Sequence, residues 1–306
     1  MIRHLESENI DKQKWDACIE GSFNTSIFAY SWYLNCVAKK WSALILNDYE
    51  AVFPIATKTK YKIKYAYQPF FSRYFGVFSK TKPSEKLVKE FTQAIPDAIK
   101  FIEFSLHESN SIHDQNAEIK EKKFQVLSLG APYETIAKNY SENTKRSIKK
   151  AIKSGLKLQK GIEPEKIVSL FKTTKGGELE IFADSDYKTL IKLMNKCLDD
   201  NRGESLAVYD GDKLCAAAFF MFNGNKFTYL KNGITEEGKT KGAMYFLIDS
   251  FVREKADQSF ELDFGGSSVD SVSQFYKKFG AKDFVYLQIK INRLPVVAKW
   301  IKKLTS

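Results

Sequence analysis

Two spacings of apolar residues alternate along the second half of the chain and predict its helices and strands. Within Asp186–Asp199 apolar residues recur every three or four positions, the spacing of one helix face. They are Tyr187, Leu190, Ile191, Met194, Cys197 and Leu198. Short apolar runs then predict strands over Ser205–Tyr209, Lys213–Phe222 and Lys226–Asn232. Asp210-Gly211-Asp212 and Asn223-Gly224-Asn225 separate these runs, so we expect an antiparallel meander.

The rest of the chain mixes both kinds of element. Its first half has a helical pattern over Ser84–Ile99 and strand patterns over Ala43–Leu46, Ala51–Ala56, Phe101–Leu106 and Lys123–Leu129. After the meander come a helix over Ala243–Lys255, a strand over Phe260–Phe264, a helix over Val269–Phe279 and a strand over Asp283–Ile291. The pattern predicts a fold of the α/β (α+β) class.

A strongly basic helix is predicted over Asn143–Ser154, with Gly155 as its natural stop. Ile148 and Ile152, four positions apart, are expected to form its narrow apolar face. The cations are Lys145, Arg146, Lys149, Lys150 and Lys153. They are typical of a solvated surface, but they are also suited to holding the phosphates of tRNA. We place the domain boundary near this helix.

Length and charge narrow the class of protein. The chain has 306 residues, which at roughly 150 per domain suggests two domains. Its net charge of +11 favours an anionic partner such as a nucleotide, a coenzyme, tRNA or a membrane surface. The four cysteines form no CxxC pair, which argues against a zinc ribbon or a thioredoxin-type motif, and such low cysteine use fits a reducing compartment. The sequence has neither an apolar signal core nor a membrane-length apolar run, so we expect a soluble, cytoplasmic protein.

A loop rich in glycine and lysine is predicted over Glu237–Gly242, between a predicted strand and the helix that begins at Ala243. Bare backbone amides at a helix start bind anions, and Gly242 would let a diphosphate approach the backbone closely. The predicted cofactor-binding residues are Asn232, Lys239, Lys241, Gly242 and Ala243. A solvated turn with incidental lysines is the simpler alternative.

Tyr276 lies on the helix that follows the glycines Gly265 and Gly266. A phenol, with a pKa of about 10, can protonate a thiolate leaving group. The alternative is that Tyr276 is a half-buried packing residue. The histidines His4, His107 and His113 have no triad or metal spacing, so we expect no metal site.

These segments resemble the GNAT acyl-CoA N-acyltransferase superfamily. Lys239–Met244 is similar to its (Gln/Arg)-x-x-Gly-x-(Gly/Ala) loop, with Lys239 in place of Gln or Arg and Met244 in place of the small residue. Phe275–Gly280 matches the helix pattern Phe-Tyr-x-x-x-Gly. The order of elements from Glu204 to Ile291 also matches that of the family.

The wider chain resembles the FemAB-like branch, which carries two such folds in tandem. Lys145–Leu156 is similar to its linking helix Arg-x-x-Ile-x-Lys-Ala-x-x-x-Gly, and Leu262–Gly266 to its Asp-Phe-x-Gly strand end. The branch's later Phe-Lys pair is Phe275-Tyr276 here. The resemblance implies two tandem GNAT-like domains, 1–142 and 143–306, each a mixed, mostly antiparallel sheet flanked by helices.

The resemblance also implies an activity. It is transfer of an acyl or aminoacyl group from acyl-CoA, or alternatively from aminoacyl-tRNA, to an amine acceptor. The acceptor would be a small molecule or a cell-wall or polysaccharide precursor, bound between the domains. Tyr276 would protonate the leaving group, and Asp263 or Glu204 would help to deprotonate the amine. Tyr67, Gln68, Arg73 and Tyr74 would border the acceptor cleft, although the tyrosines are equally suited to a core.

Two further expectations concern binding. The substitutions at Lys239 and Met244, with the basic helix, also suit a catalytically silent relative that binds tRNA or another anionic polymer. The C-terminal segment is amphipathic, with Val296, Val297, Trp300, Ile301 and Leu304 beside Lys299, Lys302 and Lys303. It could lie weakly on an anionic membrane, although such tails more often dock on their own domain.

Overall fold

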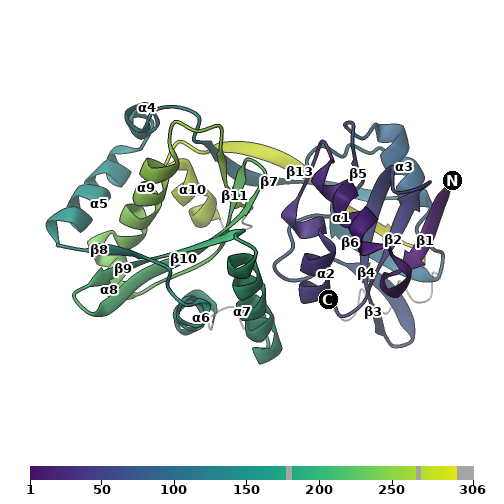
Figure 1. Cartoon of the computed structure of the whole chain (residues 1–306), viewed down its shortest axis with the longest axis horizontal. Helices are drawn as coiled ribbons and strands as arrows, with labels where there is room; N and C mark the ends of the chain where they lie inside the picture. The colour runs from purple at the N-terminus through teal and green to yellow at the C-terminus, as the bar shows by residue number, and fades with distance from the viewer. Residues whose placement is uncertain (177–180, 267–269, 295–306) are drawn as a thin grey trace. The chain divides into compact units, whose positions relative to one another are not determined.

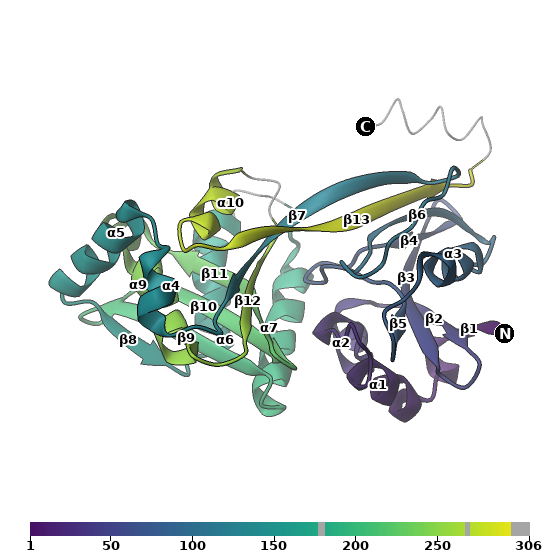
Figure 2. The ribbon, with the colours of Figure 1, turned by 90° about the horizontal axis from the view of Figure 1, so that it is seen from above.

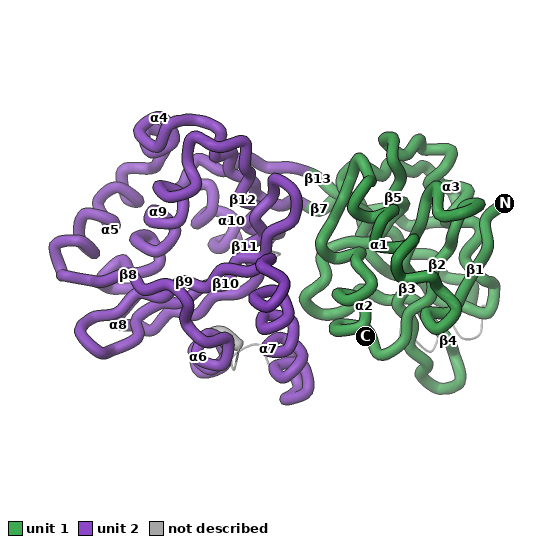
Figure 3. Tube along the Cα trace, in the orientation of Figure 1, with its two compact units in different colours: residues 1–122, 285–306 green, residues 123–284 purple. Residues whose placement is uncertain are grey.

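The structure is a computed structural model of the whole chain, and it describes residues 1–176, 181–266 and 270–294 (Figure 1). These residues fall into two compact units (Figure 3). The first comprises residues 1–122 with 285–294, and the second comprises 123–284. Among the described helices, none has the length and apolar character needed to cross a membrane.

The compact units do not coincide with the predicted ranges 1–142 and 143–306, because the chain returns to its first unit near its end. Strand β13 (Lys282–Asn292) pairs with β6 (Ile99–Ser105) from Gln288 opposite Ser105 to Asn292 opposite Phe101. The buried residues Ile289 and Ile291 are thereby added to the first unit.

The first unit is a mixed sheet covered by helices. Its strands follow the order β1-β2-β3-β4-β6, and all neighbours are antiparallel except β4 and β6. The strands are β1 (Ile2–Glu6), β2 (Trp41–Leu46), β3 (Ala51–Lys60) and β4 (Ile63–Tyr67), and the short β5 (Phe78–Ser79) pairs with β3. The helices are α1 (Lys12–Glu20), α2 (Ser31–Val37) and α3 (Glu85–Gln93), with single turns at Ser7–Asn9 and Ile27–Ala29. Trp15, Phe53, Phe91 and Phe104 are fully buried in its core.

The second unit contains the predicted meander, β9 (Gly203–Asp210), β10 (Lys213–Asn223) and β11 (Lys226–Ile234). Gly211 and Gly224 adopt positive φ in the two tight turns, as the turn sequences predict. The sheet continues with β7 (Glu118–Ser128), β12 (Glu261–Gly265) and β8 (Lys157–Lys160), in the order β7-β12-β11-β10-β9-β8. Only the β11–β12 pair is parallel in this part of the sheet.

Helices cover both faces of this second sheet (Figures 1 and 2). One face carries α9 (Ala243–Lys255), on which α5 (Glu142–Lys153) packs, together with α10 (Asp270–Lys277). The other face carries α6 (Pro164–Phe171) and α7 (Asp184–Asp199). The remaining helices are α4 (Tyr133–Lys138), α8 (Glu236–Lys241) and the turn η3 (Lys172–Gly176). Each unit is therefore a mixed, mostly antiparallel sheet flanked by helices, as predicted.

Helix α5 forms as predicted, but its apolar face is not the predicted one. Its buried residues are Thr144, Ile148 and Ala151, whereas Ile152 is 56% exposed. The prediction for Ile152 was wrong because α9 contacts α5 along the line through positions 144, 148 and 151, at spacings of four and three.

Candidate active site

Strands β11 and β12 separate soon after they meet. Their parallel pairing covers only Lys226–Thr228 against Glu261–Asp263, although β11 continues to Ile234. Along that remainder β11 stays paired with β10 on its other edge. Because backbone groups of a strand point alternately to its two edges, the edge of β11 beyond Thr228 offers amides that no pairing with β12 uses. The two strands therefore diverge beyond Thr228.

An aromatic cluster lies where the two strands separate. The Phe264 ring of β12 stacks on the Tyr276 ring of α10, with centroids 4.6 Å apart. The Tyr229 ring of β11 meets both edge-on, at 5.9 Å from Phe264 and 6.1 Å from Tyr276. Tyr276 is 7% exposed, so it is a packing residue of this cluster, and its role as the acid stays a prediction.

Tyr229 is the most enclosed member of this cluster. Its hydroxyl donates to the Sδ of Met244, 3.0 Å away. Burial, and secondarily the nearby Tyr276, raises the pKa of Tyr229 well above its usual value. The Tyr229 phenol therefore stays protonated. Its hydrogen-bond acceptor is the sulfur of Met244, the residue that stands where the GNAT loop pattern has a small residue.

Asp263 is not on the same face as this cluster. Residues opposite one another in adjacent strands share a face. Leu262, opposite Leu127, belongs to the core beneath α9, and the next pair, Asp263 and Val126, points the other way. The buried Asp263 carboxylate accepts the backbone N–H of Gly265 at 2.9 Å, which fixes the turn at the end of β12. Asp263 thus lies on the face of β12 opposite to Leu262, and its role as a base stays a prediction.

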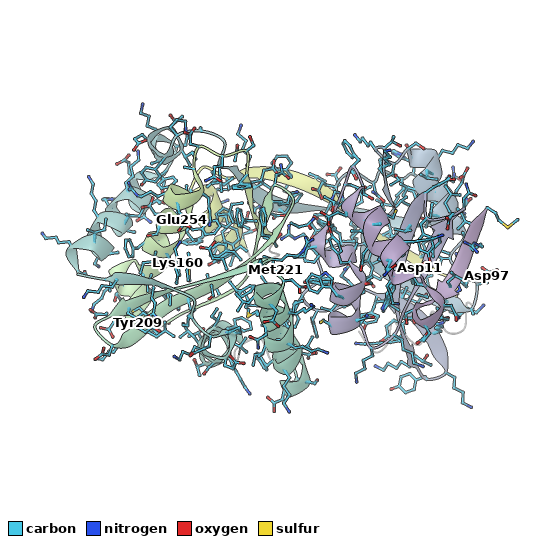
Figure 4. All side chains as sticks on the ribbon, in the orientation of Figure 1. Asp11, Asp97, Lys160, Tyr209, Met221 and Glu254 are labelled. Carbon is cyan, nitrogen blue, oxygen red and sulfur yellow. The ribbon has the colours of Figure 1, made fainter. Side chains whose placement is uncertain are left out.

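Glu204, the other predicted base, lies in an ion-pair network between α9 and the edge of the sheet. Figure 4 labels two members of this network, Lys160 and Glu254. Its Oε2 lies 2.8 Å from the Nζ of Lys255. The Nζ of Lys160 lies 3.8 Å from Glu204 and 2.5 Å from Glu254. These contacts indicate that Glu204 ties α9 to β8 and β9.

The prediction of a loop over Glu237–Gly242 was wrong, because residues Glu236–Lys241 form the helix α8. Thr235 caps this helix by accepting the N–H of Gly238 at 2.9 Å. Gly238 is required by packing, since a Cβ there would lie 2.3 Å from the carbonyl oxygen of Cys215. The glycine that suggested a flexible loop allows a helix to pack closely on β10.

The cofactor-binding residues predicted on this segment are engaged in local contacts. Lys239 pairs with Glu236, and Lys241 pairs with Asp210 and, at 2.9 Å, with Glu237. These hydrogen bonds raise the pKa of Lys241. Asn232 lies on β11 opposite Ala218 and is half-buried.

Gly242 and Ala243 are buried at the junction of α8 and α9. Gly242 adopts a φ of +77°, and a Cβ on it would lie 2.5 Å from the carbonyl oxygen of Ser147 in α5. The expected open approach to the Gly242 backbone is therefore occupied by α5. The glycine serves a close contact between helices instead.

The acceptor residues predicted in the first unit divide into core and surface. Tyr74 is 2% exposed, and its ring meets the His107 ring edge-on at 4.6 Å. The guanidinium of half-buried Arg73 lies 5.8 Å from the Phe28 ring. Gln68 accepts the N–H of Ser105 at 3.1 Å, and Lys58 lies over the half-buried Tyr67 ring at 4.2 Å. Tyr74 is thus a core residue, whereas the other three reach the surface of the unit.

Lys231 on β11 is a candidate functional residue that the sequence pattern does not indicate. A bulge at Leu230 turns it to the face covered by α6, where its Nζ lies 4.1 Å from the Phe171 ring and 5.1 Å from the Phe182 ring. Burial lowers the pKa of Lys231 to about 8. A bulge cannot be read from alternation alone, so the strand pattern gave no signal for this orientation.

Two further predictions concern binding surfaces. Arg146, Lys149, Lys150 and Lys153 are exposed on α5, as expected of either a solvated or a phosphate-binding face. The amphipathic segment from Val296 to Leu304 lies outside the described residues. Within the described ranges, no three side chains of His, Cys, Asp or Glu gather as a metal site.

Comparison with known proteins shows which family model and which solved structures this chain is similar to. The family model for the GNAT acetyltransferase domain matches residues 138–278. FemX has a similar structure, with a TM-score of 0.64 and 12% identity over 93% of this chain and 96% of that one. L-PGS from Bacillus licheniformis has a TM-score of 0.54 and 10% identity, over 96% of both chains. A tandem GNAT protein from the clavulanic acid biosynthesis pathway has a TM-score of 0.53 and 10% identity, over 96% and 99%.

No curated protein sequence matches this chain significantly. The family match nevertheless supports an acyltransferase domain within residues 138–278. Residues 138–278 match the GNAT acetyltransferase domain, and the chain as a whole has a fold similar to that of the tandem GNAT protein. The predicted resemblance to the GNAT superfamily is confirmed over residues 138–278, and the predicted tandem fold is confirmed for the whole chain by its similarity to FemX and the tandem GNAT protein.

Proposed function

We propose that the chain transfers an acyl or aminoacyl group from a thioester or ester donor to an amine. The observation that carries this proposal is the early end of the β11–β12 pairing, which leaves backbone amides beyond Thr228 beside the buried phenol of Tyr276. The donor carbonyl lies along that edge. Amides pre-oriented in this way stabilise the oxyanion of a tetrahedral intermediate.

The reaction follows from these groups. The neutral amine attacks the donor carbonyl carbon and forms the new C–N bond, while the carbonyl oxygen takes up negative charge at the β11 amides. The intermediate collapses, and the C–S or C–O bond to the leaving group breaks. Tyr276 gives its proton to the departing sulfur or oxygen, and the proton lost by the amine restores the phenol. In this scheme the amine attacks in its neutral form, and the carboxylate of Asp263 fixes the turn at the end of β12 by accepting the N–H of Gly265.

Two donors are compatible with this chemistry, acyl-CoA and aminoacyl-tRNA. The burial of Gly242 against Ser147 weighs against diphosphate binding at that glycine. The exposed cations of α5 weigh in favour of a donor with many phosphates. Donor consumption should therefore be measured with acetyl-CoA and with aminoacylated tRNA, each against a panel of primary amines.

The central test is Tyr276→Phe, which keeps the ring on Phe264 and removes only the hydroxyl. We expect turnover to fall by about 100- to 10,000-fold, the range for a lost general acid, with unchanged donor affinity. The matched control is Tyr229→Phe, which removes the neighbouring hydroxyl and should retain most of the turnover. Equal turnover of Tyr276→Phe and the parent protein would exclude Tyr276 from the reaction.

A second candidate function is binding of tRNA or another anionic polymer without catalysis. The exposed cationic face of α5 favours it, because counterion release makes such binding strong and salt-dependent. Titration with bulk tRNA at two salt concentrations tests it. Steep salt dependence, with no consumption of either donor by any amine, would favour this function over acyl transfer.

A further inference from the structure

The β3–β4 hairpin of the first unit has an unusual tip. The two strands pair from Thr57 opposite Ala66 to Lys60 opposite Ile63, so the turn consists of Tyr61 and Lys62 alone. Both have positive φ, 50° and 62°. Two-residue turns of this kind favour Asn-Gly, and larger side chains are disfavoured there. The chain therefore carries an aromatic residue and a cation at a place where the backbone disfavours both.

The tip is exposed as well as strained. Tyr61 is 86% exposed, and the Nζ of Lys60 lies 5.4 Å from its ring centroid. Figure 1 shows the hairpin extending beyond the rest of the first unit. An exposed tyrosine at the end of a projecting hairpin contributes little to the stability of the unit's own core, which suggests that it contacts something outside the chain.

Lysines surround this tyrosine. Lys58, Lys60 and Lys62 are exposed on the hairpin. Lys39 and Lys40 extend the charge to its base, where the Thr57 N–H donates to the Lys40 carbonyl oxygen at 3.1 Å. Among the described residues, none provides a carboxylate that pairs with any of these five lysines, whereas the neighbouring Lys64 pairs with Glu6 at 3.5 Å. The hairpin is a local concentration of uncompensated positive charge.

We propose that the β3–β4 hairpin docks on the surface of an anionic lipid bilayer, with Tyr61 at the level of the headgroups and the lysines on the lipid phosphates. Tyrosine and lysine are the residues that favour this interface, since each has an apolar body and a polar end. A projecting tip suits a broad, flat partner, whereas single-stranded nucleic acids are held in grooves. The proposal concerns the first unit alone and stands whether or not the chain transfers acyl groups.

Cosedimentation of the full chain with vesicles tests the proposal. We expect binding to vesicles of phosphatidylcholine mixed with phosphatidylglycerol, and none to phosphatidylcholine alone. The triple variant Lys58→Gln, Lys60→Gln, Lys62→Gln should bind about 100-fold more weakly, at about fivefold per lysine. Tyr61→Asn, which suits the positive φ, should weaken binding severalfold, and Tyr61→Trp should preserve it.

The matched control places the same three changes on α5, at Lys149, Lys150 and Lys153, which are also exposed. Each triple variant lowers the formal net charge from +11 to +8 (11 − 3). An equal loss of binding in both would indicate a general charge effect and overturn the proposal. So would unchanged vesicle binding of the hairpin variant. Loss of bulk tRNA binding in the hairpin variant, with vesicle binding intact, would assign the hairpin to nucleic acid instead.

Discussion

Single residues in this chain often have a different role from the one that their type suggests. Gly238 and Gly242 resemble loop glycines in the sequence, yet both lie where a Cβ would collide with a carbonyl oxygen of a neighbouring element. Tyr276 lies in a recognisable motif on α10, whereas its ring neighbours Tyr229 and Phe264 come from two strands, β11 and β12. Residue type indicates what a side chain can do, whereas its neighbours determine which of these possibilities it performs.

Replacement of Gly242 by alanine tests its packing role. We expect Gly242→Ala to lower the free energy of unfolding by about 2 to 4 kcal/mol, because a Cβ meets Ser147 at 2.5 Å and φ is +77°. Gly155→Ala is the control, since φ there is +72° but no atom lies within 4 Å. It should cost about 1 to 2 kcal/mol. Denaturant unfolding measures both, and equal losses would contradict the packing role.

The stability of the chain should depend on the charge of Lys231. Its folded pKa of about 8 lies below the unfolded value, about 10.4, because burial disfavours the ammonium. Between these values the unfolded state holds more protons, so stability rises with pH. Lys231→Met removes the buried charge. We expect its free energy of unfolding to exceed that of the parent protein most at neutral pH, and the difference to shrink above pH 8. Unfolding measured from pH 7 to 10 checks this, with exposed Lys213→Met as control.

At the scale of elements, pattern and turn chemistry predicted most strands and helices but not their partners. The meander β9-β10-β11 follows from its tight turns, which are local. The face that α5 buries depends on the direction in which α9 crosses it, and no local signal carries that direction. For the same reason, α8 was mistaken for a loop.

The two isoleucines of α5 provide a direct test of which face is buried. Ile148→Ala should lower the free energy of unfolding by about 2 to 4 kcal/mol, because Ile148 is 7% exposed beneath α9. Ile152→Ala makes the same chemical change at a residue that is 56% exposed, and should stay within about 0.5 kcal/mol of the parent. Denaturant unfolding distinguishes them, and a larger loss at Ile152 would mean that α5 is rotated.

At the scale of the whole molecule, the end of the chain stabilises its beginning. Truncation after Phe284 deletes most of β13, which removes the pairing with β6 and the buried Ile289 and Ile291. We expect the first unit to unfold at a lower temperature, and the amides of β6 to exchange faster with deuterium. The matched control ends at Leu294 and keeps all of β13. Unchanged exchange in β6 of the shorter chain would show that β13 contributes nothing to the first unit.

By itself, the sequence determined the class of fold, the order of the elements in the second half, the excess of positive charge and the motif that contains Tyr276. These properties are local or additive. Periodicity, turn residues and net charge can be read without knowing which other segment of the chain each element packs against. Only the tertiary structure decided that β11 and β12 separate after Thr228, that Asp263 faces away from the core beneath α9 and that α5 occupies the space beside Gly242. Each of these depends on contacts between segments far apart in the sequence, and a contact is a property of both partners.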